Sequence, residues 1–136
     1  MPKSDSNDAD ASAPTPQRRR SPRYLCEGAA EAMIVTPDAE ILLRGSICNI
    51  SLHGCFIQSH TPARLVLSSA AEVRFKVNGR SYRCAALVRN IQPGVGTAFE
   101  FCLLSAAMKA RIAALIRELA AEAADPAPYV GVRNSK

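Results

Sequence analysis

Residues 72–89 read EVRFKVNGRSYRCAALVR, and this stretch decides the fold class. Over residues 72–77 apolar and charged side chains alternate, which is the period of a strand with one face on a core. Asn78-Gly79 then supplies two residues that tolerate positive φ, as a type I′ turn requires. The apolar positions of the return strand are Tyr82, Cys84, Ala86 and Val88. The stretch predicts an antiparallel hairpin with one buried face.

Short apolar runs separated by turn signals continue on both sides of this hairpin, from Leu25 to Phe101. Residues 41–51 and 55–58 predict a second strand pair, and residues 95–101 predict a further strand. The apolar side of that last strand would be formed by Val95, Thr97, Phe99 and Phe101. The spacing is typical of a small antiparallel β-structure.

The hydrophobic period changes after Leu104. Ser105 is a favourable N-cap, and the apolar residues that follow recur at helical spacing: Met108, Ile112, Leu115, Ile116 and Leu119. The pattern predicts one amphipathic helix over residues 105–123, ended by Asp125-Pro126.

The chain has 136 residues, 48% of them apolar, which suits a single domain; we expect it to span residues 17–123. Residues 1–16 are polar and contain prolines, and are predicted to be a disordered tail; residues 124–136 are expected to be flexible. Residues 1–16 lack the features of a secretory signal, and no apolar stretch is long enough to cross a membrane. We expect a cytoplasmic protein without membrane insertion.

The five cysteines are scattered without a Cys-x-x-Cys pair, and His53 and His60 share no ligand spacing with them. We therefore expect no disulfide framework, no metal site and no cofactor. His53 has no paired carboxylate or thiol in the sequence, so we assign it no catalytic role.

The net charge of +5 is concentrated in residues 17–23, QRRRSPR. Without Arg18, Arg19, Arg20 and Arg23 the net charge would fall to +1. A local cluster suits a compact anionic ligand better than a long polyanion. The arginine fork can donate two hydrogen bonds to phosphate, or to O6 and N7 of guanine. The alternative is a solvated basic patch at the domain edge.

Residues 49–54, Asn-Ile-Ser-Leu-His-Gly, end one predicted strand and begin a turn. If the strand persists to Ser51, Asn49 and Ser51 share one face while Ile50 faces the core. Asn49 and Ser51 can each donate and accept hydrogen bonds, and Gly54 permits close approach of backbone to a ligand. The alternative is a turn stabilised by the Asn or Ser side chain, with no ligand.

The order of these features resembles the PilZ family. Its two signatures, Arg-x-x-x-Arg and Asp/Asn-x-Ser-x-x-Gly, are matched by Arg19 with Arg23 and by Asn49, Ser51 and Gly54. Residues 87–89 and 94–99 look like the closing strands of the family, so the resemblance runs from about Gln17 to Leu119.

The resemblance implies a six-stranded antiparallel β-barrel with a C-terminal helix, and a site for cyclic di-GMP. By carry-over, Arg19 and Arg23 would hold phosphate and guanine, Arg18 and Arg20 would add contacts, and Asn49, Ser51 and Gly54 would receive the rest of the ligand. Ligand binding would change the conformation of the domain and signal to a partner protein in motility, pilus or exopolysaccharide control. We expect a monomer or weak dimer.

The sequence also bears on three other functions. The sequence has no nucleophile elbow, HExxH or P-loop, so we expect no enzymatic activity. Nucleic-acid binding is disfavoured because aromatic residues are few and no stacking platform is evident. A PilZ-like interaction module that binds no nucleotide remains the main alternative.

Overall fold

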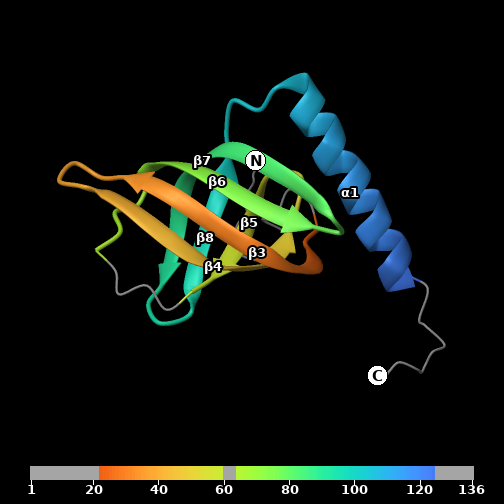
Figure 1. The fold of residues 1–136 in the computed structure, drawn as a ribbon, viewed down its shortest axis with the longest axis horizontal. Coiled ribbons are helices and arrows are strands. Elements are labelled where there is room, and N and C mark those ends of the chain that lie inside the picture. The colour runs from red at the N-terminus through yellow and green to blue at the C-terminus, as the bar shows by residue number, and fades with distance from the viewer. Residues whose placement is uncertain (1–21, 60–63, 125–136) are drawn as a thin grey trace, which may run out of the picture.

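A computed structural model describes residues 22–59 and 64–124, which form six strands followed by one helix (Figure 1). In chain order the elements are β3 (Tyr24–Val35), β4 (Glu40–Ile50), β5 (Gly54–Gln58), β6 (Ala70–Val77), β7 (Arg80–Gln92), β8 (Gly96–Phe101) and α1 (Ala106–Ala124).

The strands form a closed barrel in the order β3-β4-β5-β8-β7-β6, and β6 pairs with β3 to close it. Every pair is antiparallel. Closure leaves no free sheet edge along the paired residues. The predicted six-stranded antiparallel barrel with a C-terminal helix is confirmed.

The β6–β7 hairpin has the predicted register, since Val77 pairs with Arg80 across the turn. Asn78 and Gly79 have φ values of 53° and 78°, as a type I′ turn requires. The predicted apolar faces of both strands are buried, whereas Arg74 and Lys76 are exposed. The alternating pattern therefore gave the correct inner and outer faces.

The prediction for Val95 was wrong. Val95 is 47% exposed and precedes β8, whereas Thr97, Phe99 and Phe101 are buried as expected. The backbone N–H of Val95 donates to the carbonyl oxygen of Gln92 at 2.9 Å, so Val95 is the last residue of the β7–β8 turn. The turn takes up the residue that simple alternation assigned to the strand.

The helix α1 begins where Ser105 caps it, because the backbone N–H of Met108 donates to Ser105 Oγ at 3.0 Å. Its buried residues are Ile112, Leu115 and Leu119, and Met108 and Ile116 pack beside the core. The predicted apolar face and N-cap are confirmed.

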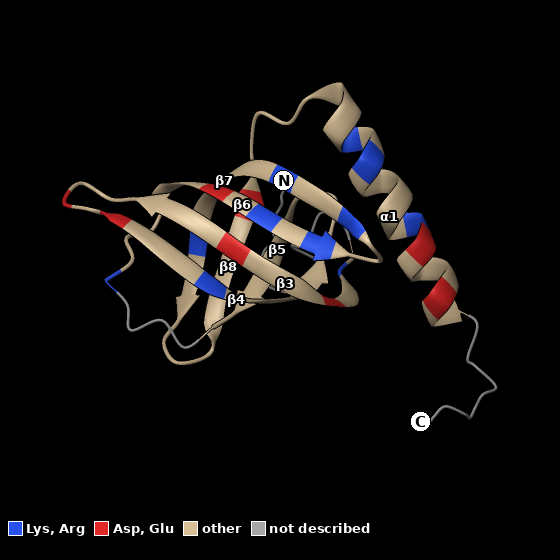
Figure 2. Cartoon of the chain, viewed as in Figure 1, with Lys and Arg blue, Asp and Glu red and all other residues tan. Residues whose placement is uncertain are grey.

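Both acidic residues of α1, Glu118 and Glu122, lie in its second half, where they do not complement the helix dipole (Figure 2). The acidic end contacts the β6–β7 turn instead: Glu118 accepts hydrogen bonds from Arg80 and, at 3.1 Å, from Asn78 Nδ2. These hydrogen bonds lower the pKa of Glu118 below its ordinary value of 4.5. The charges of α1 therefore serve tertiary contacts.

We predict that Glu118→Gln makes the stability of the domain depend less on pH under acidic conditions. Because the pKa of Glu118 is lowered in the folded state, its ionised form stabilises the fold above pH 4.5, and this contribution is lost as the pH falls through the folded-state pKa. The melting temperature should therefore fall less steeply with decreasing pH in the variant than in the wild type. Thermal melts across this range test it, with the exposed Glu40→Gln as control. Equal slopes in all three proteins would contradict it.

Candidate functional site

The two predicted binding motifs meet where β3 begins and β4 ends. Tyr24 pairs with Ile50 and Leu25 pairs with Asn49. Continuing this antiparallel register by one residue places Arg23 opposite Ser51. The β3–β4 pairing thus brings the last arginine of the basic cluster beside the Asn-x-Ser-x-x-Gly segment.

Arg23 is exposed, and its positive charge acts on Cys48 of β4. Burial raises the pKa of the Cys48 thiol, and the nearby Arg23 guanidinium opposes this shift. Arg18, Arg19 and Arg20 lie outside the described residues.

A β-bulge positions Asn49. The register of β4 against β5 shifts between Ile47 and Asn49, and Ile47 and Ile50 are both fully buried although they are three residues apart. Ile50 faces the core as predicted. The strand ends at Ile50, however, instead of persisting to Ser51.

The side-chain oxygen of Asn49 is buried and has no hydrogen-bond partner among the described residues. On the other side of the amide, Nδ2 lies 4.0 Å from Cys48 Sγ. Leaving a buried acceptor unpaired costs about 1–3 kcal/mol. Asn49 Oδ1 is therefore prepared to accept a hydrogen bond from a donor outside this part of the chain.

Ser51 shapes the turn. It is 7% exposed, its Oγ accepts a hydrogen bond from the backbone N–H of His53 at 3.1 Å, and its own N–H donates to the carbonyl oxygen of Gly54 at 2.8 Å. The turn that the sequence offered as an alternative is present at Ser51, and direct contact of Ser51 with a ligand stays a prediction.

Gly54 is required by the barrel itself. A Cβ atom at this position would lie 2.1 Å from the carbonyl oxygen of Phe99 on β8. The absence of a side chain lets β5 approach β8 closely, and so fixes where the turn stands. The sequence offered close approach to a ligand as the reason for this glycine; the structure shows close approach to backbone.

Sequence reasoning missed the apolar residues around this site. Leu25, beside Asn49, is 84% exposed, and Leu103 is 95% exposed with a φ of 54°. A cavity of about 470 Å³ lies between the turn, the end of β8 and α1, with Lys109 on its wall. The sequence carried no signal for this exposure, because an apolar residue in a strand pattern does not show whether it is buried.

Other kinds of site find little support in the described part of the chain. All five cysteines are free thiols. Residues 22–59 and 64–124 contain no group of three or more His, Cys, Asp or Glu side chains able to hold a metal ion together. Within the same ranges, no helix has the length and apolar character needed to cross a membrane.

The fold and the site together define a small β-barrel module with a polar site at one end. The family model of the PilZ domain matches residues 17–118. The chain belongs to the PilZ domain family, and the resemblance seen in the sequence is confirmed. No curated protein matches the chain.

Solved PilZ structures share the fold. The PilZ domain of YcgR from Escherichia coli, solved with c-di-GMP, has 21% identity and a TM-score of 0.64, with 84% of this chain and 100% of that chain covered. The PilZ domain of CeSA from a cellulose-synthesising bacterium has 19% identity and a TM-score of 0.60, with 74% and 99% covered. The Bacillus subtilis inhibitor of motility, MotI, has 18% identity and a TM-score of 0.61, with 82% of this chain and 54% of MotI covered.

We predict that Gly54→Ala destabilises the domain in the absence of any ligand. The new methyl group collides with the Phe99 carbonyl, and overpacking of this kind costs about 1–3 kcal/mol. Urea denaturation measures the loss. Leu52→Ala, in the same turn but half exposed, is the matched control and should cost much less. Wild-type stability for Gly54→Ala would contradict the packing role.

Proposed function

We propose that this protein is a cyclic di-GMP receptor that changes conformation on binding and signals to a partner protein in motility, pilus or exopolysaccharide control. The observation that carries the proposal is the unpartnered, buried Asn49 Oδ1 beside the exposed Arg23. One group accepts a hydrogen bond and the other donates several, which suits a ligand with both donors and anionic acceptors.

Cyclic di-GMP has this combination. Guanine presents an amino group that can donate to Asn49 Oδ1, and its O6 and N7 atoms accept from a guanidinium. The two phosphates are the natural partners of the remaining arginines. In this proposal Arg23 and Arg19 hold phosphate and guanine, Arg18 and Arg20 add contacts, and Ser51 and Gly54 hold the turn that presents Asn49.

The family and its solved members support this assignment. YcgR of Escherichia coli has been solved in complex with c-di-GMP, both as a PilZ domain and as a longer chain. MotI of Bacillus subtilis is an inhibitor of motility, and this chain spans about half of MotI and of the longer YcgR structure. These facts concern those proteins, and binding by this chain is our proposal.

The proposal also includes the location, the oligomeric state and the absence of enzymatic activity. PilZ domains are ligand-binding modules, so we propose no enzymatic activity and no cofactor beyond the bound dinucleotide. We propose a bacterial cytoplasmic protein that acts as a monomer or weak dimer, without nucleic-acid binding or membrane insertion. The signal would pass from the ligand to the turn and to α1, because the cavity beside the turn is walled by both.

We predict that Arg23→Ala lowers the affinity for cyclic di-GMP on the order of tenfold or more. The change deletes charge-assisted hydrogen bonds worth roughly 1.5–3 kcal/mol each, and 1.4 kcal/mol corresponds to about tenfold. Arg117→Ala removes an exposed arginine of α1 and should leave binding unchanged. Calorimetry on both variants gives affinity and stoichiometry. Equal binding by wild type and Arg23→Ala would remove Arg23 from the site.

We predict that Asn49→Ala loses discrimination between cyclic di-GMP and cyclic di-AMP. Cyclic di-AMP keeps the ring and both phosphates but lacks the guanine amino group and O6. The wild type should bind it at least about tenfold more weakly, because a site built for a hydrogen bond rejects a ligand that lacks it. Asn90→Ala, an exposed asparagine on β7, is the control. Equal binding of both dinucleotides by the wild type would contradict the prediction, because it would mean that the site recognises only the charge of the ligand.

A further inference from the structure

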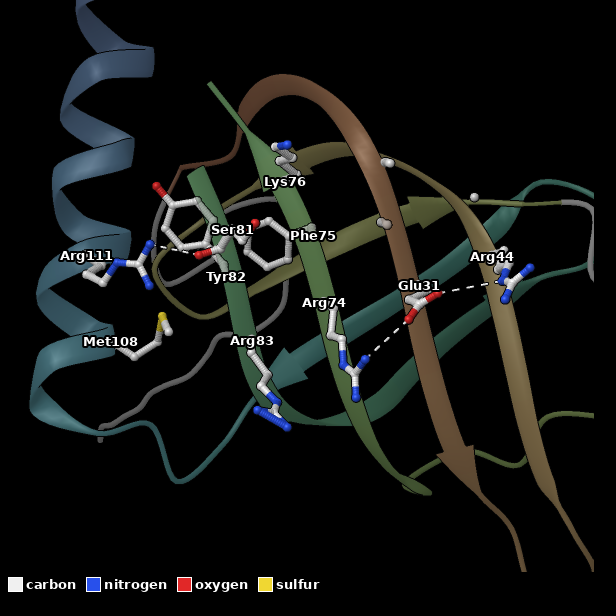
Figure 3. Close-up of a pocket in the computed structure, with 13 residues that line it drawn as sticks. Glu31, Arg44, Arg74, Phe75, Lys76, Ser81, Tyr82, Arg83, Met108 and Arg111 are labelled. Carbon is white, nitrogen blue, oxygen red and sulfur yellow. Dashed lines mark hydrogen bonds and ion pairs between the residues drawn. The ribbon is translucent and has the colours of Figure 1, made fainter. Parts of the chain in front are cut away.

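A second cavity, of about 720 Å³, lies between α1 and strands β3, β4, β6 and β7 (Figure 3). Its volume falls within the usual range of small-molecule sites. It shares no lining residue with the segment Asn49–Gly54 or with Arg23. We call it the α1 groove.

The floor of the α1 groove is apolar and aromatic. Phe75 and Tyr82 lie stacked with their ring centroids 5.0 Å apart, and Met108 of α1 closes the groove from the helix side (Figure 3). Both rings are almost fully buried, Phe75 at 3% and Tyr82 at 2% exposed, so the apolar surface open to a ligand is that of Met108 and of Ala29 on β3.

The rim of the α1 groove has an excess of positive charge. Its charged residues are Arg44, Arg74, Lys76, Arg83 and Arg111, with Glu31 as the one lining carboxylate. Glu31 pairs with Arg44 and Arg74, each at 3.6 Å, and Glu72 outside the lining pairs with Arg83 at 2.6 Å. Lys76 and Arg111 have no carboxylate partner among the described residues, so the groove favours an anion.

Arg111 is held in place on this rim. Its guanidinium lies 4.7 Å from the centroid of the Tyr82 ring and donates to the carbonyl oxygen of Ser81 at 2.8 Å. A cation near the start of a helix opposes the helix dipole, so the helix itself gains nothing from it. Its position is explained by the groove wall, where it adds a fixed positive charge.

We propose that the α1 groove is a second ligand site, which binds a small organic anion with an aromatic or apolar body. The body lies against Met108 and Ala29. The anionic group, a carboxylate or sulfonate, accepts hydrogen bonds from Lys76 or Arg111. This inference is independent of the cyclic di-GMP proposal, because the two sites share no residue.

The test uses anilinonaphthalene sulfonate, an aromatic anion whose fluorescence rises in apolar sites, titrated into the full chain. We expect saturable binding with a stoichiometry of one, weakened by salt. Lys76→Gln should weaken it on the order of tenfold, since it removes a charge-assisted hydrogen bond. Arg117→Gln removes one exposed charge of α1 outside the groove and should leave it unchanged. Equal binding by both variants, or binding that does not saturate, would overturn the proposal.

Arg23→Ala keeps the two proposals distinguishable. This variant should bind the probe like the wild type even if it no longer binds cyclic di-GMP. If cyclic di-GMP lowered the apparent affinity for the probe without limit as its concentration rose, the two ligands would share one site and a separate groove would be refuted; an effect that levels off would be coupling between two sites.

Discussion

The pairing of β3 on both of its sides is the constraint on which the rest of this structure depends. Its second half, Ala30–Val35, pairs with β4 and with β6 and thereby closes the barrel, whereas its first residues pair only with β4. The division falls at Gly28, where a Cβ atom would meet the carbonyl oxygen of Lys76 on β6 at 1.7 Å. Before Gly28, the start of β3 pairs with β4 alone among the described residues, and this pairing sets Arg23 beside the end of β4.

The barrel separates two surfaces of different chemistry. The end of β4 presents a buried acceptor beside an exposed cation, which suits a ligand that carries donors and phosphates. The α1 groove presents Met108 beside Lys76 and Arg111, two cations without a carboxylate partner among the described residues, which suits a simple anion with an apolar body. Since α1 borders both the groove and the cavity beside the turn, it is the element through which the two ligands could influence each other.

Local patterns were enough to predict most of the fold. Alternation, the Asn78-Gly79 turn and the Ser105 cap each depend on neighbouring residues, and each is confirmed. The bulge at Asn49 and the role of Gly54 could not be read in this way, because they depend on strands that lie far away in the sequence. The prediction that Val95 lies in the strand was wrong for a related reason, since the length of the β7–β8 turn decides where the alternation of β8 begins. The α1 groove gave no sequence signal, as its charges come from separate elements.

The central claim is that the start of β3 and the β4–β5 turn form one ligand site. The most direct measurement is an NMR titration of the full chain with cyclic di-GMP, followed through backbone amide shifts. We expect the amide signals of Leu25, Asn49 and Gly54 to shift together and their shifts to saturate with one common midpoint concentration of ligand. The amide signals of Ala29 and Ser81 in the α1 groove should shift much less. Absence of saturable shifts at Leu25, Asn49 and Gly54, or larger shifts in the groove, would contradict it.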